Sequence, residues 1–147
     1  MNDNDFSAAV SERRFGGIAR LYGADALNRF AAAHVCVVGV GGVGSWAVEA
    51  LARSGIGALT LIDLDNVAES NVNRQLHALT CDFGKAKVTA LHERILQINP
   101  ACRVTEIEDF VTEDNLPVLF RRPFDFVIDA IDQMRVKAAM AAYFVRH

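Results

Sequence analysis

The sequence has few cysteines and no pattern that pairs them. Cys36, Cys81 and Cys102 lie far apart and form no CxxC motif, so neither a disulfide framework nor a zinc site is predicted. The N-terminal residues MNDNDFSAAVSERR lack the pattern of a signal peptide, and no apolar run is long enough to span a bilayer. We therefore expect a cytoplasmic protein.

A strong charge of either sign is also absent. The formal net charge is −3, which gives no support for broad electrostatic binding to nucleic acid and leaves only a local basic patch as an alternative. The chain has 147 residues, 52% of them hydrophobic, which is enough for one domain with its own core. We expect the polar residues 1–12 to be flexible and residues 13–147 to form the domain.

Short apolar runs alternate with stretches of helical spacing. Residues 34–40, HVCVVGV, are apolar after His34 and rich in valine, which is typical of a buried parallel strand. Three more strands are predicted at residues 58–65, 102–109 and 124–131. Helices are predicted at residues 18–33 with a break at Gly23, and at residues 43–53, 84–98, 113–120 and 132–147. This order predicts an α/β fold: a Rossmann-like, doubly wound parallel sheet in three α/β/α layers, with its last strands beyond residue 147.

A glycine-rich turn follows the first predicted strand. Gly39, Gly41 and Gly44 satisfy the pattern G-x-G-x-x-G. The first permits a tight turn, the second lets the backbone approach a phosphate, and the third lets the helix pack closely on the sheet. Asp63 ends the next strand, where an acid accepts hydrogen bonds from ribose hydroxyls. The pattern predicts a nucleotide site but does not separate NAD or FAD from ATP.

The segment after Asp63 favours ATP. It brings two cations, Arg74 and Lys87, and two amides, Asn71 and Gln75, none of which a dehydrogenase needs. Arginine and lysine directed at one region suit a triphosphate, because charge must be neutralised when a phosphate is attacked.

The fourth predicted strand ends with two aspartates, Asp129 and Asp132. They fall at the carboxyl edge of the sheet, where open α/β folds bind ligands. A magnesium ion that is carried by ATP takes oxygen ligands and needs few contacts from the protein. These carboxylates are therefore candidate neighbours of Mg²⁺.

Five motifs in this order resemble the adenylating domain of the ubiquitin-activating-enzyme superfamily, in its ThiF/MoeB/HesA group: GVGGVG, DLD, NVNRQ, GKAK and DAID. The resemblance runs from about Arg13 to the last residue. It implies an ATP-dependent adenylating enzyme in which a substrate carboxylate attacks the α-phosphate of Mg-ATP. It also implies a homodimer.

The resemblance implies which residues bind the nucleotide. The set is Gly39, Gly41, Gly42, Gly44, Asp63, Asn71, Arg74, Gln75, Lys87 and Asp132. Gly41 and its neighbours would lie against the phosphates, and Asp63 would hold the ribose. Arg74, Lys87 and Asp132 would be the catalytic residues, and Asp132 would also be linked to Mg²⁺.

Other residues near these motifs receive structural roles. We expect Asp129 to order its turn and Gln75 to support the loop that carries Arg74. Asp65 is expected to form local hydrogen bonds, and His77 to be a packed loop residue with no chemical role.

One position departs from the pattern of the group. Its members carry two arginines in a phrase like RYxRQ near the N-terminus, and one reaches into the ATP site of the partner subunit. Here the phrase is RRFGGIARLYG. Arg14 matches the first arginine, Gly17 replaces the second, and Arg20 is a substitute, so the identity of a trans-acting arginine is open.

Branches of the group differ in the carboxylate that they activate. Some act on the C-terminal glycine of a ubiquitin-like sulfur carrier. Another activates N6-threonylcarbamoyladenosine in tRNA and closes it to a ring with loss of water. The phrases RFGGIARLYG and NRQLHAL, and Trp46 after GS, are similar to the tRNA branch. That similarity implies tRNA as partner, together with a cysteine-desulfurase system.

Three alternatives stay open. The first is adenylation of a sulfur-carrier protein, which often accompanies CxxC pairs further along the chain. The second is an NAD- or FAD-binding oxidoreductase, and the third is a non-catalytic scaffold with the same fold.

Overall fold

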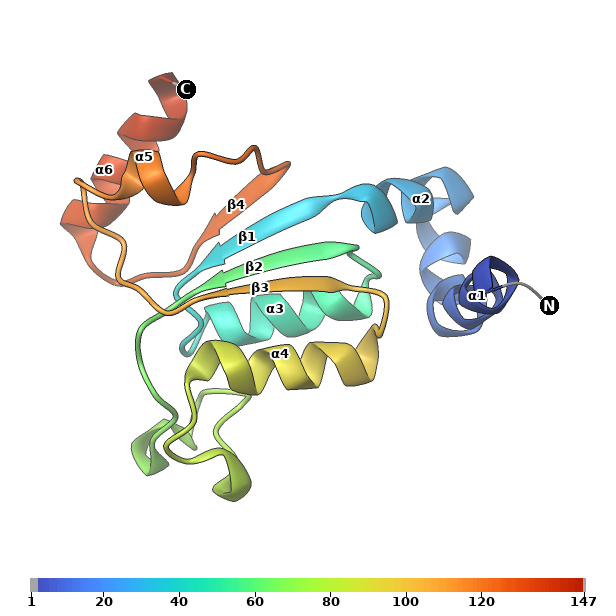
Figure 1. Ribbon diagram of the computed structural model, residues 1–147, viewed down its shortest axis with the longest axis horizontal. Helices are drawn as coiled ribbons and strands as arrows, with labels where there is room; N and C mark the ends of the chain where they lie inside the picture. The colour runs from blue at the N-terminus through green and yellow to red at the C-terminus, as the bar shows by residue number, and fades with distance from the viewer. Residues whose placement is uncertain (1–2, 147) are drawn as a thin grey trace.

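Four parallel strands form one sheet in the computed structural model, which describes residues 3–146, with side chains from residue 12. They are β1 (His34–Val38), β2 (Ala58–Ile62), β3 (Arg103–Ile107) and β4 (Phe126–Asp129), in the order β3-β2-β1-β4 (Figure 1). The direction of winding changes between β1 and β4, and a crevice at that point is where folds of this kind bind ligands. The predicted doubly wound parallel sheet is confirmed.

Helices cover both faces of the sheet. On one face lie α3 (Gly44–Arg53) and α4 (Lys87–Ile98), and on the other lie α5 (Leu116–Leu119) and α6 (Met134–Arg146) (Figure 1). Side chains of β1 alternate between the layers: Val35 and Val37 join the core with α3 and α4, while Cys36 and Val38 join the core with α5 and α6. Because both faces are covered, the strand is apolar after His34. The three-layer prediction is confirmed.

Two helices precede the sheet and lie at the amino ends of its strands (Figure 1). They are α1 (Asp3–Tyr22) and α2 (Ala24–Ala32), separated by Gly23 at φ 91° as predicted. From Asp3 onward the N-terminal segment is helical, and no glycine or proline interrupts it before Gly16. The expected flexibility of residues 1–12 stays a prediction. Met1 and Asn2 lie outside the described residues, and a domain boundary at residue 13 stays a prediction.

Several predicted elements are shorter than expected. β1 ends at Val38 because the following residues form the glycine turn. α4 begins at Lys87, since residues 84–86 pair instead with the loop after β2 through the Asn66–Ala86 bridge and the Val67 N to Lys85 O bond of 2.8 Å. α5 has only four residues, and His147 lies outside the described part of α6. Two short 3-10 turns, η1 (Glu69–Asn71) and η2 (Thr80–Asp82), interrupt the long connection between β2 and α4.

No helix within residues 3–146 is long and apolar enough to cross a membrane.

Cys36 is fully buried in the core, where burial raises the pKa of its thiol to about 12. The thiol is therefore unreactive at neutral pH.

Candidate nucleotide site at the carboxyl ends of the strands

A pocket of about 550 Å³ lies at the carboxyl edge of the sheet, where the loops after all four strands meet the start of α4. Its volume is in the range of ordinary ligand sites. It is lined by these predicted site residues: Gly39, Gly41, Gly42, Asp63, Asn71, Arg74, Gln75, Lys87 and Asp132. Gly44, which was also predicted to contact the nucleotide, does not line it.

Gly39 and Gly44 allow the glycine turn to close. Gly39 has φ 81°, and a Cβ atom there would stand 2.9 Å from the Cγ2 atom of Ile131. A Cβ atom on Gly44 would stand 1.8 Å from the carbonyl oxygen of Gly39. A side chain on Gly39 would therefore push the glycine turn away from the turn after β4, and one on Gly44 would push the start of α3 away from Gly39. Gly44 contributes through this packing rather than by facing the pocket.

Asp63 connects the glycine turn to the end of β2. Its Oδ2 accepts a hydrogen bond from the Val40 N–H at 2.8 Å, and its Oδ1 accepts one from the Asp65 N–H at 2.9 Å. Each carboxylate oxygen can accept more than one hydrogen bond, so the side chain can also serve a ligand in the pocket that it lines.

The loop that carries Arg74 is held by its own residues. The side-chain Oδ1 of Asn71 accepts from the Ala68 N–H at 3.0 Å, and its carbonyl accepts from the Gln75 N–H at 2.9 Å. The guanidinium of Arg74 donates to the Ser70 carbonyl at 3.0 Å and to Asn73 at 2.8 Å. These two bonds come from Nη1, so most of the five guanidinium donors are not used by them.

Arg74 and Gln75 lie directly over the glycine turn. A Cβ atom on Gly42 would stand 3.5 Å from Arg74 Cγ, and one on Gly41 would stand 3.6 Å from Gln75 Nε2. Gln75 is 7% exposed, as expected of a residue that supports the loop.

Lys87 is the first residue of α4 and is only 5% exposed. Its Nζ lies 2.9 Å from Asp65 Oδ2, and its backbone N–H donates to the Asp65 carbonyl at 3.0 Å. Asp65 was predicted to form local hydrogen bonds only, and its pairing with Lys87, 22 positions later, was missed. The signal that could have indicated it is the second acid of DLD, which ends the same strand as Asp63.

A tight turn after β4 carries Asp132 to the pocket. Asp129 Oδ1 accepts from the Ile131 N–H at 3.2 Å, so Asp129 orders the turn as expected. Lys137 of α6, which the sequence did not single out, lies 2.9 Å from the same carboxylate and donates to the Ile131 carbonyl at 3.0 Å.

Asp132 is exposed at the rim of the pocket. Within residues 3–146, no group of three or more His, Cys, Asp or Glu side chains could hold a metal ion. Asp132 would therefore share Mg²⁺ with water molecules and with oxygen atoms of a ligand, as on a bound nucleotide.

A sequence comparison decides between the families that use such a pocket. The pattern of the ThiF family matches residues 16–147. The chain belongs to the ThiF family. The resemblance inferred from the motifs is confirmed.

Named relatives within the ThiF family include enzymes of two kinds. The chain is 61% identical to the tRNA threonylcarbamoyladenosine dehydratase of Escherichia coli strain K12, over 89% of this chain and 49% of that protein. A crystal structure of E. coli TcdA, a tRNA N6-threonylcarbamoyladenosine dehydratase, in complex with ATP matches with a TM-score of 0.90 and 60% identity, over 92% of this chain and 56% of that one. The sulfur carrier protein adenylyltransferase of Thermus thermophilus is 35% identical, over 75% of this chain and 40% of that protein. The chain spans about half the length of the first two.

His77 follows Arg74 by three residues in the same loop and is 2% exposed. Neither ring nitrogen has a hydrogen-bond partner among residues 3–146. Burial lowers the pKa of His77 to about 4, and the charge of Lys87 acts in the same direction, against the opposite effects of Asp63 and Asp82. The imidazole is therefore neutral at pH 7, consistent with the predicted packing role.

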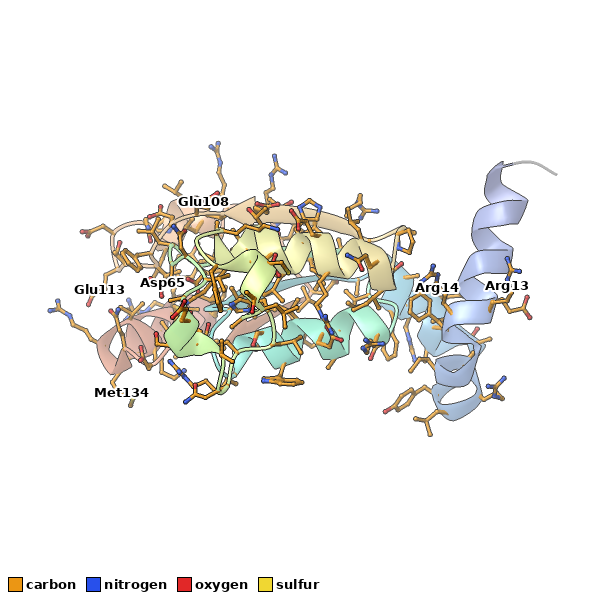
Figure 2. The ribbon with its side chains drawn as sticks, turned by 90° about the horizontal axis from the view of Figure 1, so that it is seen from below. Arg13, Arg14, Asp65, Glu108, Glu113 and Met134 are labelled. Atoms are coloured by element: carbon orange, nitrogen blue, oxygen red, sulfur yellow. The ribbon has the colours of Figure 1, made fainter. Side chains whose placement is uncertain are left out.

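The two candidates for the trans-acting arginine of the ThiF family lie away from the pocket of their own chain. Arg14 lies on α1, at the other end of the molecule from Asp65 (Figure 2). Its Nη1 donates to the carbonyls of Gln97 and Ile98, at 3.2 and 2.9 Å, where α4 ends. The guanidinium of Arg20 lies against Gly16 and Gly17. A role for either residue in a partner subunit stays a prediction.

Proposed function

We propose that this ThiF-family chain is the ATP-binding part of an enzyme that adenylates the carboxylate of N6-threonylcarbamoyladenosine in tRNA and so drives its dehydration to the cyclic form. The observation that carries the proposal is the convergence of Arg74, Lys87 and the glycine turn on one pocket. The 61% identity to a tRNA threonylcarbamoyladenosine dehydratase favours this substrate over others.

The residues of the pocket fit a nucleoside triphosphate. The open side of the turn at Gly41 and Gly42 lies under Gln75 and Arg74, where a phosphate would meet cationic and amide donors. Gln75 presents its Nε2 amide group to the turn at Gly41, and an amide N–H donates to phosphate oxygens. Asp63, which also lines the pocket, suits ribose hydroxyls.

Each of these groups has a defined task in adenylation. The carboxylate oxygen would bond to the α-phosphorus of ATP as the bond from that phosphorus to pyrophosphate breaks. Pyrophosphate leaves, and the acyl adenylate that forms carries AMP, a better leaving group than oxide. Arg74 and Lys87 offset the negative charge that grows on the phosphates as the reaction proceeds. The start of α3 adds backbone N–H groups and the positive end of the helix dipole. Asp132 would hold Mg²⁺ together with phosphate oxygens.

The decisive experiment incubates the full-length enzyme, of which this chain is the proposed ATP-binding part, with Mg-ATP and tRNA that carries the open form of N6-threonylcarbamoyladenosine. The tRNA is then digested to nucleosides, and their masses are measured by mass spectrometry. An ATP-dependent loss of one water from the modified adenosine is expected. An unchanged mass, with the protein folded and ATP bound, would reject the proposal.

A second candidate is adenylation of the C-terminal glycine of a ubiquitin-like sulfur carrier. It is supported by the 35% identity to a sulfur carrier protein adenylyltransferase. The same pocket would serve both reactions, since only the carboxylate differs. Release of pyrophosphate that depends on an added sulfur-carrier protein, with no change in the tRNA, would favour this candidate.

The proposal extends to partners and location. The tRNA is the macromolecular substrate, a homodimer is the working assembly, and a cysteine-desulfurase system is a partner. The proposed location is the cytoplasm, which contains both ATP and tRNA. Sedimentation of the protein at micromolar concentration tests the dimer.

A further inference from the structure

Trp46 is the single tryptophan of the sequence, and it lies in the first turn of α3, next to the glycine turn. It is 53% exposed, so its ring does not belong to the core. Its indole N–H donates to the backbone carbonyl of Arg74 at 3.0 Å. The ring thus attaches the loop of Arg74 to the helix that begins at the glycine turn.

Ser45, the residue before Trp46, makes a second attachment. Its Oγ accepts a hydrogen bond from the Leu76 N–H at 3.2 Å, and the residue is fully buried. Consecutive residues of α3 therefore hold the backbone on both sides of Gln75. We call Ser45 and Trp46 the α3 clamp.

The α3 clamp fixes the distance between the loop of Arg74 and the start of α3. The hydrogen bonds within the loop do not determine that distance. The guanidinium of Arg74 bonds to Ser70 and Asn73, which belong to the same loop and would move with it. The bonds from the α3 clamp instead join this loop to the element that carries the phosphate-facing N–H groups. Movement of the loop by a fraction of an ångström would misplace Arg74 relative to those groups.

We propose that Ser45 and Trp46 are positioning residues that hold Arg74 and Gln75 in register with the glycine turn for phosphate recognition. This inference rests on the proposed function, because it assigns the clamp to the residues that would contact ATP. Trp46 is the better probe, since Trp46→Phe removes the N–H donor and keeps an aromatic ring.

The first measurement tests the clamp without reference to activity. Trypsin cleaves after arginine, and Arg74 is exposed on its loop. Trp46→Phe lacks the hydrogen bond from the indole N–H to the Arg74 carbonyl. We therefore expect trypsin to cleave this variant after Arg74 about three to ten times faster than wild type, the factor that one hydrogen bond provides. Cleavage after Arg53, at the far end of α3, should be unchanged. Equal cleavage rates after Arg74 in both proteins would overturn the inference.

The second measurement tests positioning. We expect kcat of Trp46→Phe to fall about three- to tenfold, with KM for ATP changed less than about twofold, because a loosened arginine is least well placed where charge develops. In an Arg74→Ala background the same substitution should have no further effect on kcat. A loss that persists in that background would overturn action through Arg74, and so would faster cleavage with an unchanged kcat.

Tyr22→Phe is the matched control. It also removes a polar atom from an exposed aromatic ring, at the end of α1, and should change neither cleavage nor kcat. If the wild-type protein does not dehydrate N6-threonylcarbamoyladenosine in tRNA, the proposed function is rejected. The difference in trypsin cleavage after Arg74 would still test the α3 clamp. The kinetic comparison would then be made with the sulfur-carrier reaction.

Discussion

Lys87 is a buried cation whose ammonium group is paired with Asp65 at the wall of the pocket. We predict that Lys87→Ala lowers the adenylation rate at least about 100-fold, because a charge that stabilises the developing phosphate negative charge is lost. Asp132→Ala should have an effect of the same order through Mg²⁺. Rates are measured as pyrophosphate release, and circular dichroism checks the fold.

Lys85→Ala is the control for Lys87. Lys85 lies two residues earlier, and its ammonium pairs with Asp82 and Glu93 instead of facing the pocket. Its substitution should leave the rate within about twofold, because these ion pairs lie outside the pocket. A near-normal rate in Lys87→Ala or Asp132→Ala would show that the substituted residue has no catalytic role.

His77 makes the stability of the protein depend on pH. Its pKa is about 4 in the folded protein against an ordinary value of 6.5. Between these values the unfolded chain binds more protons, so its contribution to stability is present above pH 6.5 and is lost as the pH falls toward 4. We predict that His77→Leu loses about 1 kcal/mol less stability than wild type between pH 7 and pH 5.5.

Urea unfolding at the two pH values measures this difference. His34, whose pKa burial also lowers, is present in both proteins and cancels in the comparison. Equal losses in wild type and His77→Leu would show that the imidazole is not held neutral by burial.

At the scale of elements, Arg14 joins α1 to the end of α4. Its Nη1 donates to two carbonyls at the C-terminus of α4, where a cation is also favoured by the helix dipole. We predict that Arg14→Met lowers the free energy of unfolding by about 0.5–1 kcal/mol, measured by urea unfolding. Arg13→Met, a substitution at the adjacent exposed residue of α1 (Figure 2), is the control.

The same variant separates two roles for Arg14. If its function is to stabilise the end of α4, the adenylation rate at saturating ATP should stay close to that of wild type. Unchanged stability with a rate at least about tenfold lower would contradict this and would favour a trans-acting arginine, since charge neutralisation at phosphates carries effects of that size.

The elements that could be predicted from the sequence are those with a strong local pattern. β1 is an apolar run, and α4 has apolar residues at helical spacing, so both were found. The start of α1 was missed because residues 3–12 are polar and show no apolar stripe. The glycine turn and Asp63 were placed correctly, since strand ends determine their positions. The contacts of Lys137 and Trp46 were not predicted from the sequence, because both side chains bind backbone carbonyls that only the tertiary fold brings near.

At the scale of the whole molecule, the pocket joins segments that are far apart in the chain. The glycine turn, the loop of Arg74, the start of α4 and the turn after β4 all contribute to its wall. Each is attached to a different part of the sheet, so a ligand that contacts all of them binds only when the sheet is assembled. Binding must therefore stabilise the whole fold and not one loop.

This dependence gives a test that separates ATP from NAD. At a concentration 100 times its Kd, Mg-ATP should add about 2.7 kcal/mol to the free energy of unfolding. For a chain of this size we predict that the thermal midpoint rises by roughly 5–10 °C. NAD at the same concentration lacks a triphosphate for Arg74 and Lys87 and should give a much smaller rise. Lys87→Ala should lose most of the Mg-ATP effect, whereas Lys85→Ala should keep it. Both ligands could use the glycine turn and Asp63, but only ATP needs the two cations. A larger rise of the thermal midpoint with NAD than with Mg-ATP would therefore favour the NAD-binding oxidoreductase alternative.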